Sequence, residues 1–235
     1  MSKQEQLYVG QVDHLKRDIA GNLLRLIDLE VTGYKNLTLF NGPAIFDIFP
    51  HTSHIDSWAI RDALPQELKH LLVFLAKKEY WDGWRRPIGE LTNALILIPT
   101  AKGTSPRNAI RTAAHCMNQG YSIGISAEGT RTLDPIDKRR FEDGIGTLLK
   151  FAHFKPPLVP VLLQGFGRVW PKDQNLPHTI VQGGILFQRK QVYVHFGMPK
   201  FYNEKDFVDR NDLVEDFRQH CIQQFMDKFK ELDCK

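Results

Sequence analysis

The sequence predicts an α/β fold, in which a single layered domain carries a mixed, largely parallel central sheet flanked by helices. Two observations lead to this class. Short apolar runs alternate along the chain with longer amphipathic segments, as strands and helices do in layered α/β domains. The chain also has 235 residues, enough for one such domain with a large core, and it shows no internal repeat or low-complexity tract.

The N-terminal residues are predicted to form a helix. Residues 14–30 place leucine and isoleucine side chains close to helical spacing, with lysine and arginine between them. We therefore divide the chain into an N-terminal amphipathic helical segment, residues 1–30, and a main domain, residues 31–235. A strand is expected to begin within residues 31–34.

The main domain then alternates between the two kinds of element. The predicted strands are residues 43–49, 71–75, 95–98, 121–126, 158–163, 179–186 and 192–196. The predicted helices are residues 55–63, 107–119, 144–153 and 209–233. Pro50 ends the first of these strands, Ser53 is expected to cap the helix that follows, and Pro160 is expected to interrupt a later strand.

Charge and composition limit the classes of function. The formal net charge is +4, but Lys and Arg form no dense stripe of the kind that nucleic-acid binders carry, so we expect no nucleic-acid partner. Three cysteines without a CxxC pair predict a reducing compartment and no disulfide framework. The longest apolar runs are far shorter than the ~20 residues that span a bilayer. We therefore expect a cytoplasmic protein that can sit peripherally on the inner face of the membrane.

The most informative segment is His-Thr-Ser-His-Ile-Asp at residues 51–56. Histidine is the usual base for deprotonating a hydroxyl group, and a carboxylate on its other ring nitrogen fixes the tautomer. His51 and Asp56 can meet in this way if His51 ends the loop after the strand and Asp56 lies in the first helical turn. The alternative is a surface histidine beside an aspartate that only complements the helix terminus. His54 competes as the base, but it is too close to Asp56 along the chain for such a contact.

A second polar segment, Glu-Gly-Thr-Arg at residues 128–131, follows a predicted strand. Open α/β sheets place ligands at the carboxyl ends of their strands. Gly129 permits close approach or a positive φ, and Arg131 offers a planar set of donors for a phosphate or carboxylate. Glu128 can hold an acceptor hydroxyl or brace Arg131. The alternative is an ordinary surface turn with a Glu–Arg ion pair.

Together these residues resemble the glycerolipid acyltransferase family, whose type member is 1-acylglycerol-3-phosphate acyltransferase. The family's first block, a histidine, four residues and an aspartate, matches His51 through Asp56. Its third block, of Pro-Glu-Gly-Thr-Arg type, matches residues 127–131, and its fourth matches Val-Pro-Val at residues 159–161. The resemblance covers about residues 31 to 200 and implies an acyltransferase-like fold.

The resemblance also implies a reaction. His51, oriented by Asp56, would deprotonate a hydroxyl of a lyso-glycerolipid or related lipid acceptor. That hydroxyl would attack the thioester of acyl-CoA or an acyl carrier protein, with no metal and no cofactor beyond this donor substrate. The residues that help to bind the acceptor would be Glu128, Gly129, Thr130 and Arg131.

The chain departs from the family pattern at three places. Pro50 precedes the histidine where the family commonly has asparagine, and Ala127 replaces the proline of the third block. The second block usually ends with an arginine that holds the phosphate of the acceptor, and residues 96–100 contain none. Either Lys102 substitutes for it, or the acceptor is not a phosphorylated glycerol.

Two other functions stay open on the sequence alone. A metallohydrolase would use His51, His54 and Asp56 as ligands. Its further ligand would be one of His70, His115, His153, His178 and His195. A lipid-binding relative without activity is the second, although an intact His51/Asp56 pair argues against it. Membrane contact is expected of the N-terminal segment and of a cluster of aromatic and basic residues, Trp81, Trp84, Arg85 and Arg86.

Overall fold

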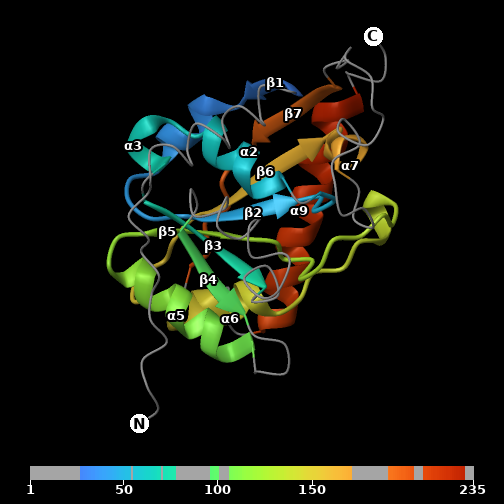
Figure 1. The fold of residues 1–235 in the computed structure, drawn as a ribbon. Helices are drawn as coiled ribbons and strands as arrows, with labels where there is room; N and C mark the ends of the chain where they lie inside the picture. The colour runs from blue at the N-terminus through green and yellow to red at the C-terminus, as the bar shows by residue number, and fades with distance from the viewer. Residues whose placement is uncertain are drawn as a thin grey trace.

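A single twisted sheet organises the molecule (Figure 1). The computed structural model describes residues 27–53, 55–69, 71–77, 96–100, 106–170, 190–203 and 209–230. Within these residues the sheet has seven strands in the order β1-β7-β6-β2-β5-β3-β4. Their bounds are β1 Ile27–Thr32, β2 Ile45–Phe49, β3 Leu72–Lys77, β4 Ile96–Thr100, β5 Ser122–Ile125, β6 Leu158–Gln164 and β7 Lys190–Phe196.

The strand directions confirm the predicted mixed, largely parallel sheet. β2 runs parallel to both of its neighbours, β5 and β6. β3 is parallel to β4 and β5, and β1 is parallel to β7. The antiparallel pair is β6 with β7. The carboxyl ends of β2, β5, β3 and β4 therefore meet at one edge of the sheet, where α/β proteins place their ligands.

Helices cover both faces of this sheet. They are α2 Asp56–Ala63, α3 Gln66–Lys69, α5 Pro106–Asn118, α6 Gly144–Phe151, α7 Phe166–Val169 and α9 Arg210–Lys230, with 3-10 turns η1 Tyr34–Leu39 and η5 Ile136–Lys138. Figure 1 shows α2 and α9 on opposite sides of the central strands. The arrangement is a layered α/β/α domain, as the alternation of elements predicts.

The two faces of the sheet have separate apolar cores because side chains alternate along each strand. On β2, Phe46 packs in the core under α2, whereas Phe49 packs in the core under α5, α6 and α9. Trp58 of α2 closes the first core and Phe217 of α9 closes the second. Each buried aromatic side chain of this size stabilises the fold by about 1.5–3 kcal/mol relative to exposure. The helices that carry the site are therefore anchored firmly on both sides.

The predicted N-terminal helix is wrong over its last four residues. Ile27 to Glu30 belong to β1, which pairs residue by residue with β7. Apolar Ile27, Leu29 and Val31 alternate with polar residues there, and pairing with β7 lets this period of two prevail over the weaker helical spacing. The boundary predicted at residue 31 consequently falls inside a strand. Residues 14–26 lie outside the described residues.

Two local predictions are also wrong. Pro160 does not interrupt β6, which runs from Leu158 to Gln164. The β6–β7 ladder begins only at Val161, and the Pro160 carbonyl accepts the N–H of Gly197, so the missing proline N–H breaks no pair in that ladder. Ser53 does not cap α2: Ile55 occupies the cap position, and the Ser53 hydroxyl donates to the buried carbonyl of Trp170 at 2.8 Å.

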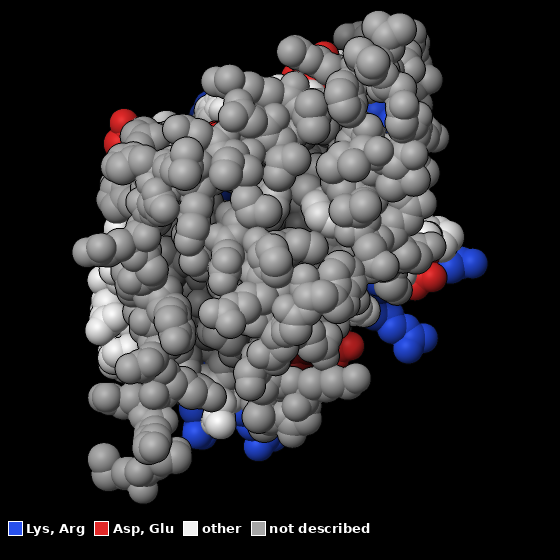
Figure 2. All heavy atoms as spheres, viewed as in Figure 1, with Lys and Arg blue, Asp and Glu red and all other residues white. Residues whose placement is uncertain are grey.

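The remaining described elements lie within a few residues of their predicted bounds. Gly120 follows α5 with φ 97°, in the left-handed conformation expected of a helix stop. Two predicted features, the strand at residues 179–186 and the cluster of Trp81, Trp84, Arg85 and Arg86, lie outside the described residues. Among the helices that are described, none combines the length and the apolar character that crossing a bilayer requires. Figure 2 shows charged side chains of both signs at the rim of the face in view.

Candidate active site

The two polar segments singled out in the sequence lie side by side at the carboxyl edge of the sheet. Residue 51 follows β2, residue 128 follows β5, and these two strands are parallel neighbours in which Asp47 is paired with Ile125. Parallel pairing brings the residues after both strands to the same edge. The link between the segments is direct, because the backbone N–H of Thr132 donates to the carbonyl of His51 at 3.2 Å.

His51 and Asp56 form the side-chain pair that their spacing predicts. Nδ1 of His51 lies 2.9 Å from Oδ2 of Asp56. The backbone N–H groups of Thr52 and Ser53 donate to the same Oδ2, at 3.0 and 2.9 Å. An oxygen with these donors acts as an acceptor, so in the neutral ring the proton lies on Nδ1 and Nε2 presents a lone pair. This is the tautomer that a general base at Nε2 requires.

The two side chains differ in exposure. Asp56 is fully buried, whereas the His51 side chain is 25% exposed. Asp56 begins α2, and its carboxylate folds back over residues 52 and 53 of the preceding loop. The aspartate is therefore held in place by backbone donors, while the ring that it orients can still be reached from outside.

Glu128 is buried against His51 rather than directed at Arg131. Its Oε2 accepts the backbone N–H of His51 at 2.6 Å, and its Oε1 accepts Nη1 of Arg139 at 2.7 Å. Burial raises the pKa of Glu128, and the charge of Arg139 with the His51 N–H opposes that rise. Of the two roles that the sequence suggests for Glu128, holding a hydroxyl or bracing an arginine, the contacts match the second, with a different arginine.

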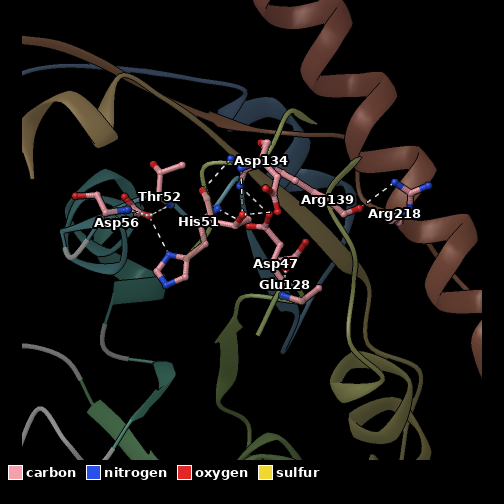
Figure 3. Close-up of polar contacts among 11 residues, drawn as sticks. Asp47, His51, Thr52, Asp56, Glu128, Asp134, Arg139 and Arg218 are labelled. Atoms are coloured by element: carbon pink, nitrogen blue, oxygen red, sulfur yellow. Dashed lines mark hydrogen bonds and ion pairs between the residues drawn. The ribbon is translucent and has the colours of Figure 1, made fainter. Parts of the chain in front are cut away.

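Arg139 ties the segment after Glu128 into a compact loop. Its Nε donates to the carbonyl of Asp134 at 3.0 Å and its Nη2 to the carbonyl of Thr132, also at 3.0 Å. The carbonyl of Arg139 in turn accepts Nη1 of Arg218 on α9 at 3.0 Å. Figure 3 shows the resulting chain of contacts, which runs from Asp56 through His51, Glu128 and Arg139 to Arg218. It joins the helices on the two faces of the sheet.

A further buried carboxyl group, Asp47 of β2, lies beneath this network. Its Oδ1 accepts the backbone N–H of Ala127 at 2.7 Å, and Sγ of Cys221 lies 3.8 Å from its Oδ2. Burial, helped by the nearby charge of Glu128, raises the pKa of Asp47 to about 8. At neutral pH Asp47 is therefore mostly protonated, and it holds Ala127, the residue before the second polar segment, against the sheet.

The other predicted site residues have the following positions. Gly129 has a φ of 66°, the positive φ that the sequence suggests, and a Cβ there would lie 3.0 Å from Glu142. Thr130 is exposed and Arg131 is half-buried in the same loop. Lys102 and His54 lie outside the described residues, so their roles stay predictions.

A metal site can be tested only in part. The described residues contain no group of three or more His, Cys, Asp and Glu side chains placed to hold a metal ion. Three of the histidines that the metallohydrolase alternative invokes, His54, His70 and His178, lie outside the described residues.

Sequence reasoning missed Asp47 and Arg139. A signal existed for Asp47: an aspartate within Ile-Phe-Asp-Ile-Phe is a charged residue in a run that is otherwise wholly apolar, and buried polar residues are the informative ones. Arg139 had no such signal, because Lys138, Arg139 and Arg140 form a basic run typical of a solvated surface.

Comparison with known proteins agrees with this geometry. A family model described as Acyltransferase matches residues 28–164, more than half of the chain and the whole of the region that carries His51, Asp56 and the 128–131 segment. The chain belongs to the acyltransferase family. The resemblance inferred from the motifs is thereby confirmed.

A solved structure shows the same acyltransferase fold. The crystal structure of the 1-acyl-sn-glycerophosphate (LPA) acyltransferase PlsC from Thermotoga maritima is similar to this chain with a TM-score of 0.56. The similarity covers 92% of this chain and 82% of that chain at 18% sequence identity. A search of curated protein sequences found no match. The structural likeness confirms the layered fold with its mixed sheet.

Proposed function

We propose that this acyltransferase moves a fatty acyl group from a thioester donor, acyl-CoA or an acyl carrier protein, to a hydroxyl of a lyso-glycerolipid or related lipid. The contact that carries this proposal is the 2.9 Å hydrogen bond from His51 Nδ1 to Asp56 Oδ2, which orients Nε2 as a base. Membership of the family supports acyl transfer, and the likeness to the LPA acyltransferase PlsC supports an acceptor of the lysophosphatidic acid type.

The proposed mechanism needs one base and no covalent enzyme intermediate. Nε2 of His51 takes the proton of the acceptor hydroxyl as its oxygen attacks the thioester carbonyl. The tetrahedral intermediate then collapses, the carbon–sulfur bond breaks, and the proton on Nε2 passes to the departing thiolate. Asp56 stabilises the imidazolium that exists between these two proton transfers. The products are an ester and a free thiol.

The acceptor is proposed to lie over the loop that follows β5. Arg131 lies in this loop, whose backbone is bonded to His51 through Thr132. A guanidinium in this loop suits an acceptor with an anionic group close to its hydroxyl. Lys102, in the position of the missing second-block arginine, is proposed to add to this binding. Peripheral contact with a membrane would bring a bilayer-resident acceptor to the site.

The test is a panel of acceptors assayed by release of free thiol from acyl-CoA and from acyl carrier protein. The panel contains a lysophosphatidic acid, a zwitterionic lysophospholipid, an uncharged monoacylglycerol and glycerol 3-phosphate. We expect thiol release with at least one acceptor, and loss of about 10²- to 10⁴-fold of the rate in His51→Ala. The matched control is His115→Ala on the surface of α5, which should keep the wild-type rate. If no acceptor supports release, or if His51→Ala keeps full activity, the proposal is wrong.

A further inference from the structure

We propose that Arg139 is a positioning residue for the base: its guanidinium holds Glu128 against the backbone of His51 and at the same time folds the loop that carries Arg131. The inference deepens the proposed function, because it rests on His51 acting as the base. The guanidinium of Arg139 donates to the carboxylate of Glu128 and to the carbonyls of Thr132 and Asp134 (Figure 3).

Both backbone groups of His51 are held by the neighbouring loop. Its N–H donates to Glu128 at 2.6 Å and its carbonyl accepts from Thr132 at 3.2 Å. With both groups engaged, residue 51 cannot shift along the edge of the sheet without breaking contacts. The bond to Asp56 sets the rotation of the His51 ring, whereas these two bonds fix the position of the His51 backbone.

Arg139 binds both of the residues that make these bonds. Nη1 of Arg139 binds the other oxygen of Glu128 at 2.7 Å, and Nη2 binds the carbonyl of Thr132 at 3.0 Å. Thus the residue whose carboxylate holds the His51 N–H and the residue whose N–H holds the His51 carbonyl share one guanidinium. A lysine would provide one point charge and could not span these partners in a plane.

The pair of Arg139 and Glu128 is also buried. Arg139 and Glu128 are 4% and 2% exposed in their side chains, so their ion pair is shielded from water and salt. The backbone carbonyl of Arg139 accepts a hydrogen bond from Nη1 of Arg218 on α9 at 3.0 Å. The position of His51 on one side of the network therefore depends on α9 on the other. Arg140, the next residue, is exposed and offers a control with the same charge.

The experiment compares Arg139→Lys and Arg139→Ala with the matched control Arg140→Ala in the thiol-release assay. Folding is checked by circular dichroism and thermal melting, and amide hydrogen exchange is followed in the peptide that contains residues 51–53. We expect kcat to fall by about 10²-fold in Arg139→Ala, the usual effect of a misplacement near 1 Å, while the KM for the thioester changes much less. Arg139→Lys is expected to fall between this variant and the wild type.

Chemical rescue separates positioning from a general loss of structure. Guanidinium at a sub-denaturing concentration should restore part of the rate of Arg139→Ala, and methylammonium should not, because it lacks the planar donors. Amides 51–53 should exchange faster in both Arg139 variants and at the wild-type rate in Arg140→Ala. If Arg139→Ala fails to fold, Arg139→Lys carries the test.

The inference is overturned if a folded Arg139→Lys keeps both the wild-type kcat and the wild-type exchange at residues 51–53. Failure of the proposed function has a different signature, because the wild type itself would then release no thiol with any acceptor. In that case the exchange of amides 51–53 alone decides whether Arg139 positions His51.

Discussion

The site contains two hydrogen-bonded side-chain pairs of similar length that differ in access. His51 and Asp56 lie 2.9 Å apart with side-chain exposures of 25% and 0%. Arg139 and Glu128 lie 2.7 Å apart with exposures of 4% and 2%. The first pair comes from residues five positions apart in one loop and helix turn, the second from residues eleven positions apart across a longer loop.

The difference in exposure matches the different roles of the two pairs. A base must meet its substrate, so one member of the first pair stays open, and an open side chain is held by few contacts. The second pair has no such requirement and can be closed on all sides. We call His51–Asp56 the open pair and Arg139–Glu128 the closed pair. Because Glu128 accepts the backbone N–H of His51, the closed pair holds the open pair in position. Preorganised support of this kind is what active sites need to keep reacting groups in line.

The largest expected effect is on the open pair. Asn at position 56 keeps an oxygen in the place of Oδ2, which accepts from His51, Thr52 and Ser53, but it lacks the negative charge that stabilises the imidazolium. Asp56→Asn should therefore lower kcat by about 10²- to 10⁴-fold, as loss of the orienting carboxylate does in other His–Asp pairs, with little change in melting temperature.

Thiol-release kinetics on purified Asp56→Asn check this expectation, with Asp62→Asn, exposed on the same helix, as control. A variant with wild-type kcat would show that the base does not need the negative charge of Asp56.

The closed pair should affect stability more than the open pair does. Glu128→Gln leaves a buried guanidinium without its anion, which costs about 3–5 kcal/mol. The matched control is Asp143→Asn, which removes the ion pair with Arg210, whose side chains are 43% and 47% exposed, and should cost less than about 1 kcal/mol. Chemical denaturation of the two variants measures the difference. Equal destabilisation would remove the distinction between the pairs.

The buried carboxyl group of Asp47 should make the free energy of unfolding depend on pH. Asp47 has a folded pKa of about 8 against an ordinary value of 3.8, so between these values the folded state holds a proton that the unfolded chain has lost. Stability then falls as the pH rises through this window, by up to about 1.4 kcal/mol per pH unit. Below pH 3.8 the Asp47 carboxyl is mostly protonated in both the folded and the unfolded state, and above about pH 8 it is mostly ionised in both.

Asp47→Asn cannot ionise, so it should remove this slope and be relatively more stable than the wild type at alkaline pH. Melting temperatures across the window, with the exposed Asp28→Asn as control, provide the measurement. A wild type and an Asp47→Asn variant with parallel pH profiles would contradict the shift.

The smallest expected effect concerns metal. Hydrogen bonds account for the contacts of both pairs, and the proposed mechanism uses neither a metal nor a cofactor beyond the donor. Dialysis against a strong chelator should leave thiol release and melting temperature unchanged. Elemental analysis that finds a stoichiometric metal, together with loss of activity on chelation, would instead support the metallohydrolase alternative.

The local features of the site could be predicted because short-range geometry dominates them. His51 and Asp56 meet through a strand, a turn and a first helical turn, and each of these has its own signal in adjacent residues. Gly129 has the positive φ that its type allows. The alternation of apolar runs likewise predicted the layered fold, since each run must bury one face or both.

The errors arose where a distant partner decided the outcome. Ile27 to Glu30 form a strand because β7 lies beside them, and Pro160 is tolerated in β6 because the antiparallel ladder starts one residue later. The Ser53 hydroxyl donates to the carbonyl of Trp170, and Ile55 takes the cap position of the helix. None of these partners is near in the chain.

By itself, the sequence determined the class of fold, the family and the His51–Asp56 pair, because periodicity and neighbouring residues carry that information. Only the tertiary structure decided that Glu128 serves His51, that Arg139 rather than Arg131 or Arg140 is its buried partner, and that Asp47 is protonated beneath them. These outcomes depend on desolvation and on contacts across the sheet edge. Such energies exist only once the chain has folded.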